Sequence, residues 1–177
     1  VGVTPENGKI ISRRRGYHGV TMAAASMTAL AYAQNGFGLP LDFVKHTTTP
    51  DFYNEGREGE SEADFTARCA AELEALILAE GPETVAALFA EPVMGAGGVV
   101  IPPQGYFAAI REVLNKYDVL LIADEVICGF GRTGSMWGSE TMDVRPDMLT
   151  CAKALSSAYL PISAVLMSDR VYDTVAS

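Results

Sequence analysis

The sequence predicts an α/β domain with a central, mostly parallel sheet and flanking helices. Short apolar runs alternate with helical segments along the chain, which is the order found in layered α/β domains. Residues 119–123 are apolar at every position, as expected of a strand buried on both faces of a parallel sheet. A chain of 177 residues is long enough to enclose one such core.

The first half of the chain is predicted to contain two helices. Residues 20–35 are rich in Ala and Met and stop at Gly36, so we expect one helix there. Residues 36–59 carry many turn-forming residues and predict an irregular surface excursion. Ser61 can cap a strong second helix with one apolar face, which ends at Gly81.

The second half predicts most of the sheet. Predicted strands cover residues 85–90, 119–123, 148–151 and 162–167. A helix is expected over residues 106–116, where apolar side chains share one stripe, and Ser168 can cap another helix near the end of the chain. The alternation of strands and helices therefore favours parallel pairing with helical crossovers.

Three predicted strands are followed by an ionisable side chain, namely Glu91, Asp124 and Lys153. Ligands of parallel α/β sheets bind beyond the carboxyl ends of the strands, so these groups are expected to converge. A carboxylate and a lysine in this arrangement are what a pyridoxal phosphate site needs. The lysine can form a Schiff base with the aldehyde, and the carboxylate can keep the pyridine nitrogen protonated.

Each of these residues also has a structural explanation. Asp124 could instead be a helix cap or half of a salt bridge, because a buried carboxylate needs a partner. Most lysines are solvated surface groups, although the apolar neighbours of Lys153 favour a partly desolvated and more nucleophilic amine. His18, taken alone, is more often a structural histidine than a catalyst.

Composition excludes several other classes of function. The net charge is −9 and no basic stripe is present, which argues against nucleic acid or an anionic membrane as a partner. No apolar run reaches the roughly 18 residues of a membrane span. The three cysteines form no CxxC pair and the histidines do not cluster, so we expect no disulfide framework, no metal site and a cytoplasmic location.

Residues 129–134, Gly-Phe-Gly-Arg-Thr-Gly, fit the GxGxxG pattern of dinucleotide-binding turns. Residues 135–139 lack the amphipathic pattern of the helix whose N-terminus should meet a pyrophosphate. We therefore interpret these glycines as a turn beneath a cofactor or at a subunit contact. A nucleotide-binding module remains the alternative from a different class.

Four stretches together resemble the class III, pyridoxal phosphate-dependent aminotransferases, and among them the ω-aminotransferases. They are residues 12–19 (SRRRGYHG), 91–98 (EPVMGAGG), 121–138 and 152–157 (AKALSS). The resemblance implies a fold type I enzyme that transfers an amino group from an amine or ω-amino acid to a keto acid such as pyruvate. An aminomutase or racemase on the same scaffold is the alternative within this resemblance.

The same resemblance implies roles for seven residues. Lys153 would be the Schiff-base lysine and proton shuttle, and Asp124 would pair with the pyridine nitrogen of pyridoxal 5'-phosphate. Val126 would pack on one face of the ring and Tyr17 on the other. The remaining cofactor-binding residues implied in this way are His18, Gly19 and Glu91.

Some features of the sequence depart from the family pattern. Ile127 stands where ornithine-type members have glutamine, and Ala158 stands where glycine is common. The upstream Gly-Ser phosphate loop, the threonine that crosses the dimer and the C-terminal small domain are not found. We therefore expect residues 1–177 to be an internal fragment of the large cofactor-binding domain of a homodimer, inactive by itself.

Overall fold

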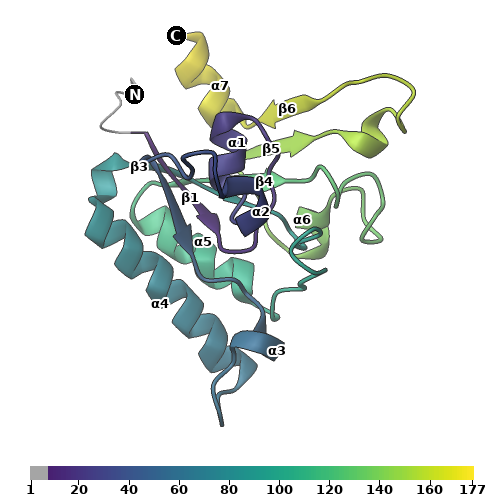
Figure 1. Cartoon of the computed structure of the whole chain (residues 1–177). Coiled ribbons are helices and arrows are strands. Elements are labelled where there is room, and N and C mark those ends of the chain that lie inside the picture. The colour runs from purple at the N-terminus through teal and green to yellow at the C-terminus, as the bar shows by residue number, and fades with distance from the viewer. Residues whose placement is uncertain (1–7) are drawn as a thin grey trace.

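The computed structural model describes residues 8–177 and is built around one sheet (Figure 1). Within these residues six strands lie in the order β2-β1-β3-β4-β5-β6. Every neighbouring pair is parallel except β5 and β6, which are antiparallel. The strands are β1 (Lys9–Arg13), β2 (Val44–Thr47), β3 (Val85–Ala90), β4 (Leu120–Asp124), β5 (Met148–Cys151) and β6 (Ala164–Met167). The predicted mostly parallel α/β sheet is confirmed.

Helices cover this sheet, and the core lies beneath the two longest of them. The helices are α1 (Met22–Met27), α2 (Ala31–Gln34), α3 (Phe52–Glu55), α4 (Glu62–Glu80), α5 (Tyr106–Lys116), α6 (Gly138–Thr141) and α7 (Asp169–Ala176). Helices α4 and α5 run side by side along one face of the sheet (Figure 1). Their apolar stripes bury Phe65, Leu73, Ile110 and Leu114 against Leu88 and Leu121 of the central strands.

Several sequence predictions agree with the structure to the residue. Helix α4 follows Ser61, whose hydroxyl accepts the N–H of Asp64 at 3.1 Å, and it ends at Gly81 with φ +88°. β3, β5 and α5 have the predicted bounds. Ser168 precedes α7 as expected, but its hydroxyl makes no capping bond. Among residues 8–177, no helix combines the length and the apolar character needed to span a bilayer.

The single helix predicted over residues 20–35 is wrong. The chain leaves the helical conformation at Thr28, between α1 and α2, where ψ is 99°. The Thr28 hydroxyl accepts the backbone N–H of His18 at 2.7 Å and donates to the carbonyl of Gly19 at 3.0 Å. These two bonds to a neighbouring loop replace the helical bonds that Ala-rich sequence would otherwise favour.

The irregular excursion predicted over residues 36–59 is also wrong, because this segment contains the edge strand β2 and the short helix α3. β2 pairs in parallel with β1, and the segment that follows it buries Thr48 and Thr49. Asp51 then caps α3 by accepting the N–H of Asn54 at 3.3 Å. A strand with one aliphatic residue in four gives little periodic signal.

Ala158 lies in a left-handed backbone conformation, with φ +66°, in the loop that precedes β6. The Cβ of an L residue collides with its own backbone there at a cost of about 1–2 kcal/mol, whereas glycine loses about 0.5–1 kcal/mol more chain entropy on folding. Glycine would therefore be the less strained residue at position 158.

We expect Ala158→Gly to raise the free energy of unfolding by up to about 1 kcal/mol in a urea titration. Ala154→Gly is the matched control, because Ala154 lies in the neighbouring 3₁₀ turn and is not among the residues with positive φ. The control variant should be no more stable than the parent. Equal effects of the two substitutions would contradict the strain assigned to Ala158.

Candidate functional site

A cavity of about 190 Å³ lies where β1, β3, β4 and β5 end. Its lining consists of Tyr17, His18, Gly19, Glu91, Asp124, Val126, Ile127 and Lys153. The structure thus brings together all seven residues singled out from the sequence, with Ile127 beside them. Their chemical roles stay predictions.

Two larger clefts lie elsewhere, with volumes of about 850 and 590 Å³. Each contains an arginine paired with a carboxylate of the same lining: Arg15 bonds Asp51 in the first, and Arg111 bonds Asp147 in the second. Neither lining contains a lysine. Chemistry rather than size therefore selects the smaller cavity as the candidate site.

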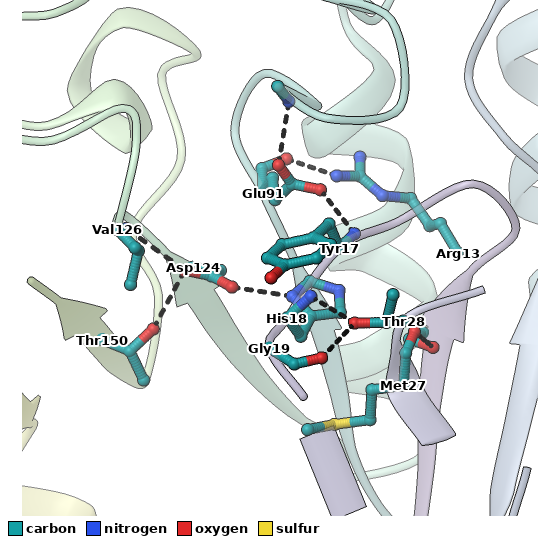
Figure 2. Close-up of polar contacts among 12 residues, drawn as sticks. Arg13, Tyr17, His18, Gly19, Met27, Thr28, Glu91, Asp124, Val126 and Thr150 are labelled. Carbon is teal, nitrogen blue, oxygen red and sulfur yellow. Dashed lines mark hydrogen bonds and ion pairs between the residues drawn. The ribbon is translucent and has the colours of Figure 1, made fainter. Parts of the chain in front are cut away.

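Asp124, the last residue of β4, is 6% exposed and faces the cavity with its charge already partnered. One carboxylate oxygen lies 2.7 Å from Nδ1 of His18 (Figure 2). The other accepts the N–H of Val126 at 3.1 Å and the hydroxyl of Thr150 at 3.3 Å. Because a carboxylate offers about four acceptor positions, Asp124 can still receive an N–H from a bound ring.

His18 stands beside Asp124 and is fixed on several sides. Its side chain is 1% exposed, and its ring meets Phe89 edge-on at 4.8 Å between centroids. Its backbone N–H is held by Thr28, the residue that interrupts the α1–α2 segment. The contact between His18 and Asp124 thus gives the histidine the structural role considered from the sequence and gives the carboxylate a partner.

Glu91 follows β3 and organises the two loops around it. It is 3% exposed; one carboxylate oxygen accepts the N–H of Tyr17 at 3.2 Å and the other accepts that of Gly95 at 2.9 Å (Figure 2). A Cβ on Gly95 would lie 2.7 Å from Cδ1 of Ile127. The side chain of Ile127 thus packs directly against Gly95 and lies in the cavity lining.

Lys153 begins a 3₁₀ turn just after β5, and its backbone has φ +47°. Left-handed backbone is uncommon for a residue other than glycine, and such strain concentrates at functional sites. The expected desolvation is not found, because Lys153 is exposed at the rim of the cavity in the described structure. Its apolar neighbours Leu149 and Cys151 are buried instead.

Two of the three cysteines, Cys69 and Cys128, do not compete with Lys153 as nucleophiles. Burial raises the pKa of the Cys128 thiol to about 11 and that of Cys69 to about 12. Both groups are consequently protonated at neutral pH, and a thiol is a far weaker nucleophile than a thiolate. The thiol of Cys128 donates to the carbonyl of Val93 at 3.3 Å, which is a structural contact behind the site.

Sequence reasoning missed Glu125, which is fully buried beside Asp124. Its carboxylate accepts the N–H of Gly138 at 2.8 Å and that of Ser139 at 2.7 Å, at the start of α6. The amides that follow the Gly-Phe-Gly-Arg-Thr-Gly turn are thereby occupied by a side chain of the protein. The geometry agrees with a structural turn at residues 129–134 and gives no support to a dinucleotide site.

The fold and the cavity define an α/β domain with a lysine and a buried carboxylate at adjacent strand ends. A family model described as "Aminotransferase class-III" matches residues 2–177. The chain therefore belongs to the class III aminotransferase family. Members of this family depend on pyridoxal phosphate.

Individual relatives agree with this assignment. The chain is 52% identical over 173 residues to the diaminobutyrate–2-oxoglutarate transaminase of Halomonas elongata, a match that covers 97% of this chain and 37% of that protein. It is 53% identical over 173 residues to gamma aminobutyrate transaminase 1, mitochondrial, of Solanum lycopersicum, covering 98% and 34%. The ω-transaminase of Pseudomonas jessenii in complex with PMP shares 54% identity with a TM-score of 0.94, covering 95% and 37%. The chain thus spans little more than a third of each of these proteins.

The cavity lining fits one end of pyridoxal phosphate. The Asp124 carboxylate is bonded to His18 but keeps an acceptor position that could receive the N–H of the ring. The exposed amine of Lys153 could serve as the nucleophile for the aldehyde. The phosphate is not matched by these residues, because Lys153 is the only lysine or arginine in the lining within the described part of the chain. Phosphate groups are commonly held by helix N-termini or clusters of backbone amides.

We expect Glu125→Ala to lower the free energy of unfolding by about 2–4 kcal/mol, because two buried amides lose their acceptor. Glu140→Ala is the control, since Glu140 accepts one backbone N–H at the surface of the same helix, α6. Glu140→Ala should lower the free energy of unfolding by less than about 1 kcal/mol, because water can replace an acceptor at an exposed site. Denaturant titration compares the two, and equal losses would contradict a special role for Glu125.

Proposed function

We propose that the complete protein transfers an amino group from an amine or ω-amino acid to a keto acid such as pyruvate, with pyridoxal 5'-phosphate as cofactor. The observation that carries this proposal is the shared cavity of Lys153 and the buried Asp124 in a chain of the class III family. The curated relatives named above are transaminases, which supports transfer over racemisation or amino-group migration.

When bound, the cofactor supplies an aldehyde that takes up the amino group and a protonated ring that withdraws electrons from the donor carbon. Asp124 would accept the N–H of the ring and keep it charged, and His18 would hold the Asp124 carboxylate in place. Val126 and Tyr17 would pack on opposite faces of the ring. Gly19 and Glu91 would shape the loop that carries Tyr17.

Lys153 would have two tasks in this scheme. Its amine would hold the aldehyde covalently at rest, and an incoming amine donor would release it. The freed amine would then carry a proton between the donor carbon and the cofactor, and the keto acid would be aminated by the same steps in reverse. The position of Lys153 at the rim leaves its amine accessible to the cofactor and to the amine donor.

We further propose that residues 1–177 form part of the large cofactor-binding domain of a homodimer. Support comes from the cavity lining, which accounts for the reactive end of the cofactor and not for the phosphate. The isolated 177-residue chain should therefore lack turnover. A cytoplasmic location is proposed from the three free cysteines, although the tomato and rice relatives are mitochondrial or chloroplastic.

We expect Lys153→Ala in the complete protein to lower the transamination rate by a factor of about 10³ or more, because the covalent anchor and the proton carrier are lost together. An added small primary amine should restore part of the rate. Lys116→Ala is the control, since Lys116 is 63% exposed and pairs with Glu74 far from the cavity. A Lys153→Ala enzyme with the rate of the control would refute the assignment.

We expect Asp124→Asn to bind the cofactor but to react about 30- to 1,000-fold more slowly, because a charge-assisted contact of this kind contributes about 2–4 kcal/mol in a transition state. The visible absorbance of bound cofactor should shift as the ring loses its proton. Asp147→Asn tests the specificity of the effect, since Asp147 is equally buried but pairs with Arg111 before β5. A rate loss below about threefold would mean that Asp124 is merely structural.

A further inference from the structure

Arg13 is a buried cation that the proposed chemistry does not use. It is the last residue of β1 and is 1% exposed, and no other lysine or arginine among residues 8–177 is buried. Its Nη2 donates to the backbone carbonyl of Glu91 (Figure 2). Its Nη1 has no hydrogen-bond partner in the described structure. A buried guanidinium with an unused donor needs a physical reason.

Three buried carboxylates, those of Asp124, Glu125 and Glu91, stand close to the candidate site, and each accepts hydrogen bonds from other parts of the protein. Asp124 is paired with His18, and Glu125 accepts two backbone amides at the start of α6. Glu91 accepts two amides as well, but no cationic side chain bonds to it within residues 8–177. A buried carboxylate without a nearby positive charge is costly. Arg13 donates to the backbone carbonyl of the same residue, which brings a buried cation to the end of β3.

The surroundings of Arg13 fix the guanidinium in one position. Its central carbon lies 6.0 Å from the ring centre of Tyr106 and 5.9 Å from that of Phe107, both in the first turn of α5 and both buried. Aromatic faces attract a guanidinium and exclude water from it. The carbonyl of Arg13 also accepts the N–H of Gly16 at 3.0 Å, closing the turn that leads to Tyr17.

We propose that Arg13 is a positioning residue of the candidate site. It joins the end of β1 to the end of β3 and balances the charge of the Glu91 carboxylate, which in turn holds the amides of Tyr17 and Gly95. The consequence for catalysis rests on the proposed function, because Tyr17 matters there as the face on which the cofactor ring packs. The bonds from Arg13 to Glu91, and from Glu91 to the amides of Tyr17 and Gly95, do not depend on a bound cofactor.

The test compares five variants of the complete protein: Arg13→Met, Arg13→Lys, Arg111→Met, Glu91→Gln and the Arg13→Lys/Glu91→Gln double variant. Arg13→Met keeps a side chain of similar length without charge, and Arg13→Lys keeps the charge but not the planar fork. Arg111→Met is the matched control, because Arg111 is also partly buried and bonds Asp147 with two nitrogens at the opposite edge of the sheet. The first measurement is hydrogen exchange of the Tyr17 and Gly95 amides without cofactor. The second is cofactor affinity together with the visible circular dichroism of the bound cofactor.

Arg13→Met should speed exchange of both amides by about tenfold or more and weaken cofactor binding, with a changed dichroism band. Arg13→Lys should recover part of the protection, whereas Arg111→Met should lower the melting temperature and leave both amides unchanged. The Arg13→Lys/Glu91→Gln double variant should bind cofactor no more weakly than Glu91→Gln alone, because Arg13 acts through Glu91.

Two results would overturn the proposal. The first is that the Tyr17 and Gly95 amides of Arg13→Met exchange at the rate seen in Arg111→Met. If Arg13→Met does not fold, the same comparison is made with Arg13→Lys. The other is additive loss of affinity in the double variant. A parent protein that fails to bind pyridoxal phosphate would refute the proposed function instead, and the exchange rates would still decide the role of Arg13.

Discussion

Parallel pairing of β1, β3, β4 and β5 is the constraint on which the candidate site depends. Parallel strands all end at the same edge of a sheet, so residues far apart in sequence, such as Tyr17 and Lys153, line one cavity. The pairing itself requires crossovers; α4 lies in the crossover from β2 to β3 and α5 in that from β3 to β4, and both cover one face of the sheet. The core beneath these helices therefore fixes the register that sets the positions of the strand ends.

Buried charge then decides the shape of the loops at that edge. Each buried carboxylate needs hydrogen-bond partners: the imidazole of His18 bonds Asp124, two amides at the start of α6 bond Glu125, and two loop amides bond Glu91. Meeting these needs interrupts the α1–α2 segment at Thr28, which supports His18. Local helix propensity gives way because a lost helical bond costs less than an unpaired buried polar group.

The sequence predicted those parts of the molecule that have strong periodic patterns. Helices α4 and α5, together with β3 and β5, repeat apolar residues clearly enough to be placed. β1 and β2 escaped prediction because charged or polar residues occupy half or more of each strand, and the burial of Arg13 depends on a carbonyl and two rings from elsewhere in the chain. Contacts between residues far apart in the chain give no pattern in the local sequence.

The site residues were accessible to sequence reasoning for a related reason. Glu91, Asp124 and Lys153 follow apolar runs, so the end of each strand marks them. Glu125 lies one residue further on and gives no such signal, since its partners at Gly138 and Ser139 are reached only through the turn between them. The exposure of Lys153 was missed because apolar neighbours in a strand alternate between faces, and burial of Cys151 says little about a residue beyond the strand end.

The charges of the cavity lining differ in sign between the buried strand ends and the rim. Glu91 and Asp124 place two carboxylates in it, against one ammonium from Lys153 at the rim. A protonated ring nitrogen is attracted by such a surface, whereas a phosphate dianion is repelled by it. In the proposed function, the residues that line the cavity would suit the nitrogen end of the cofactor, and the same electrostatics would turn the phosphate away from Asp124. Orientation of the cofactor would thus follow from the buried carboxylates before any phosphate contact is made.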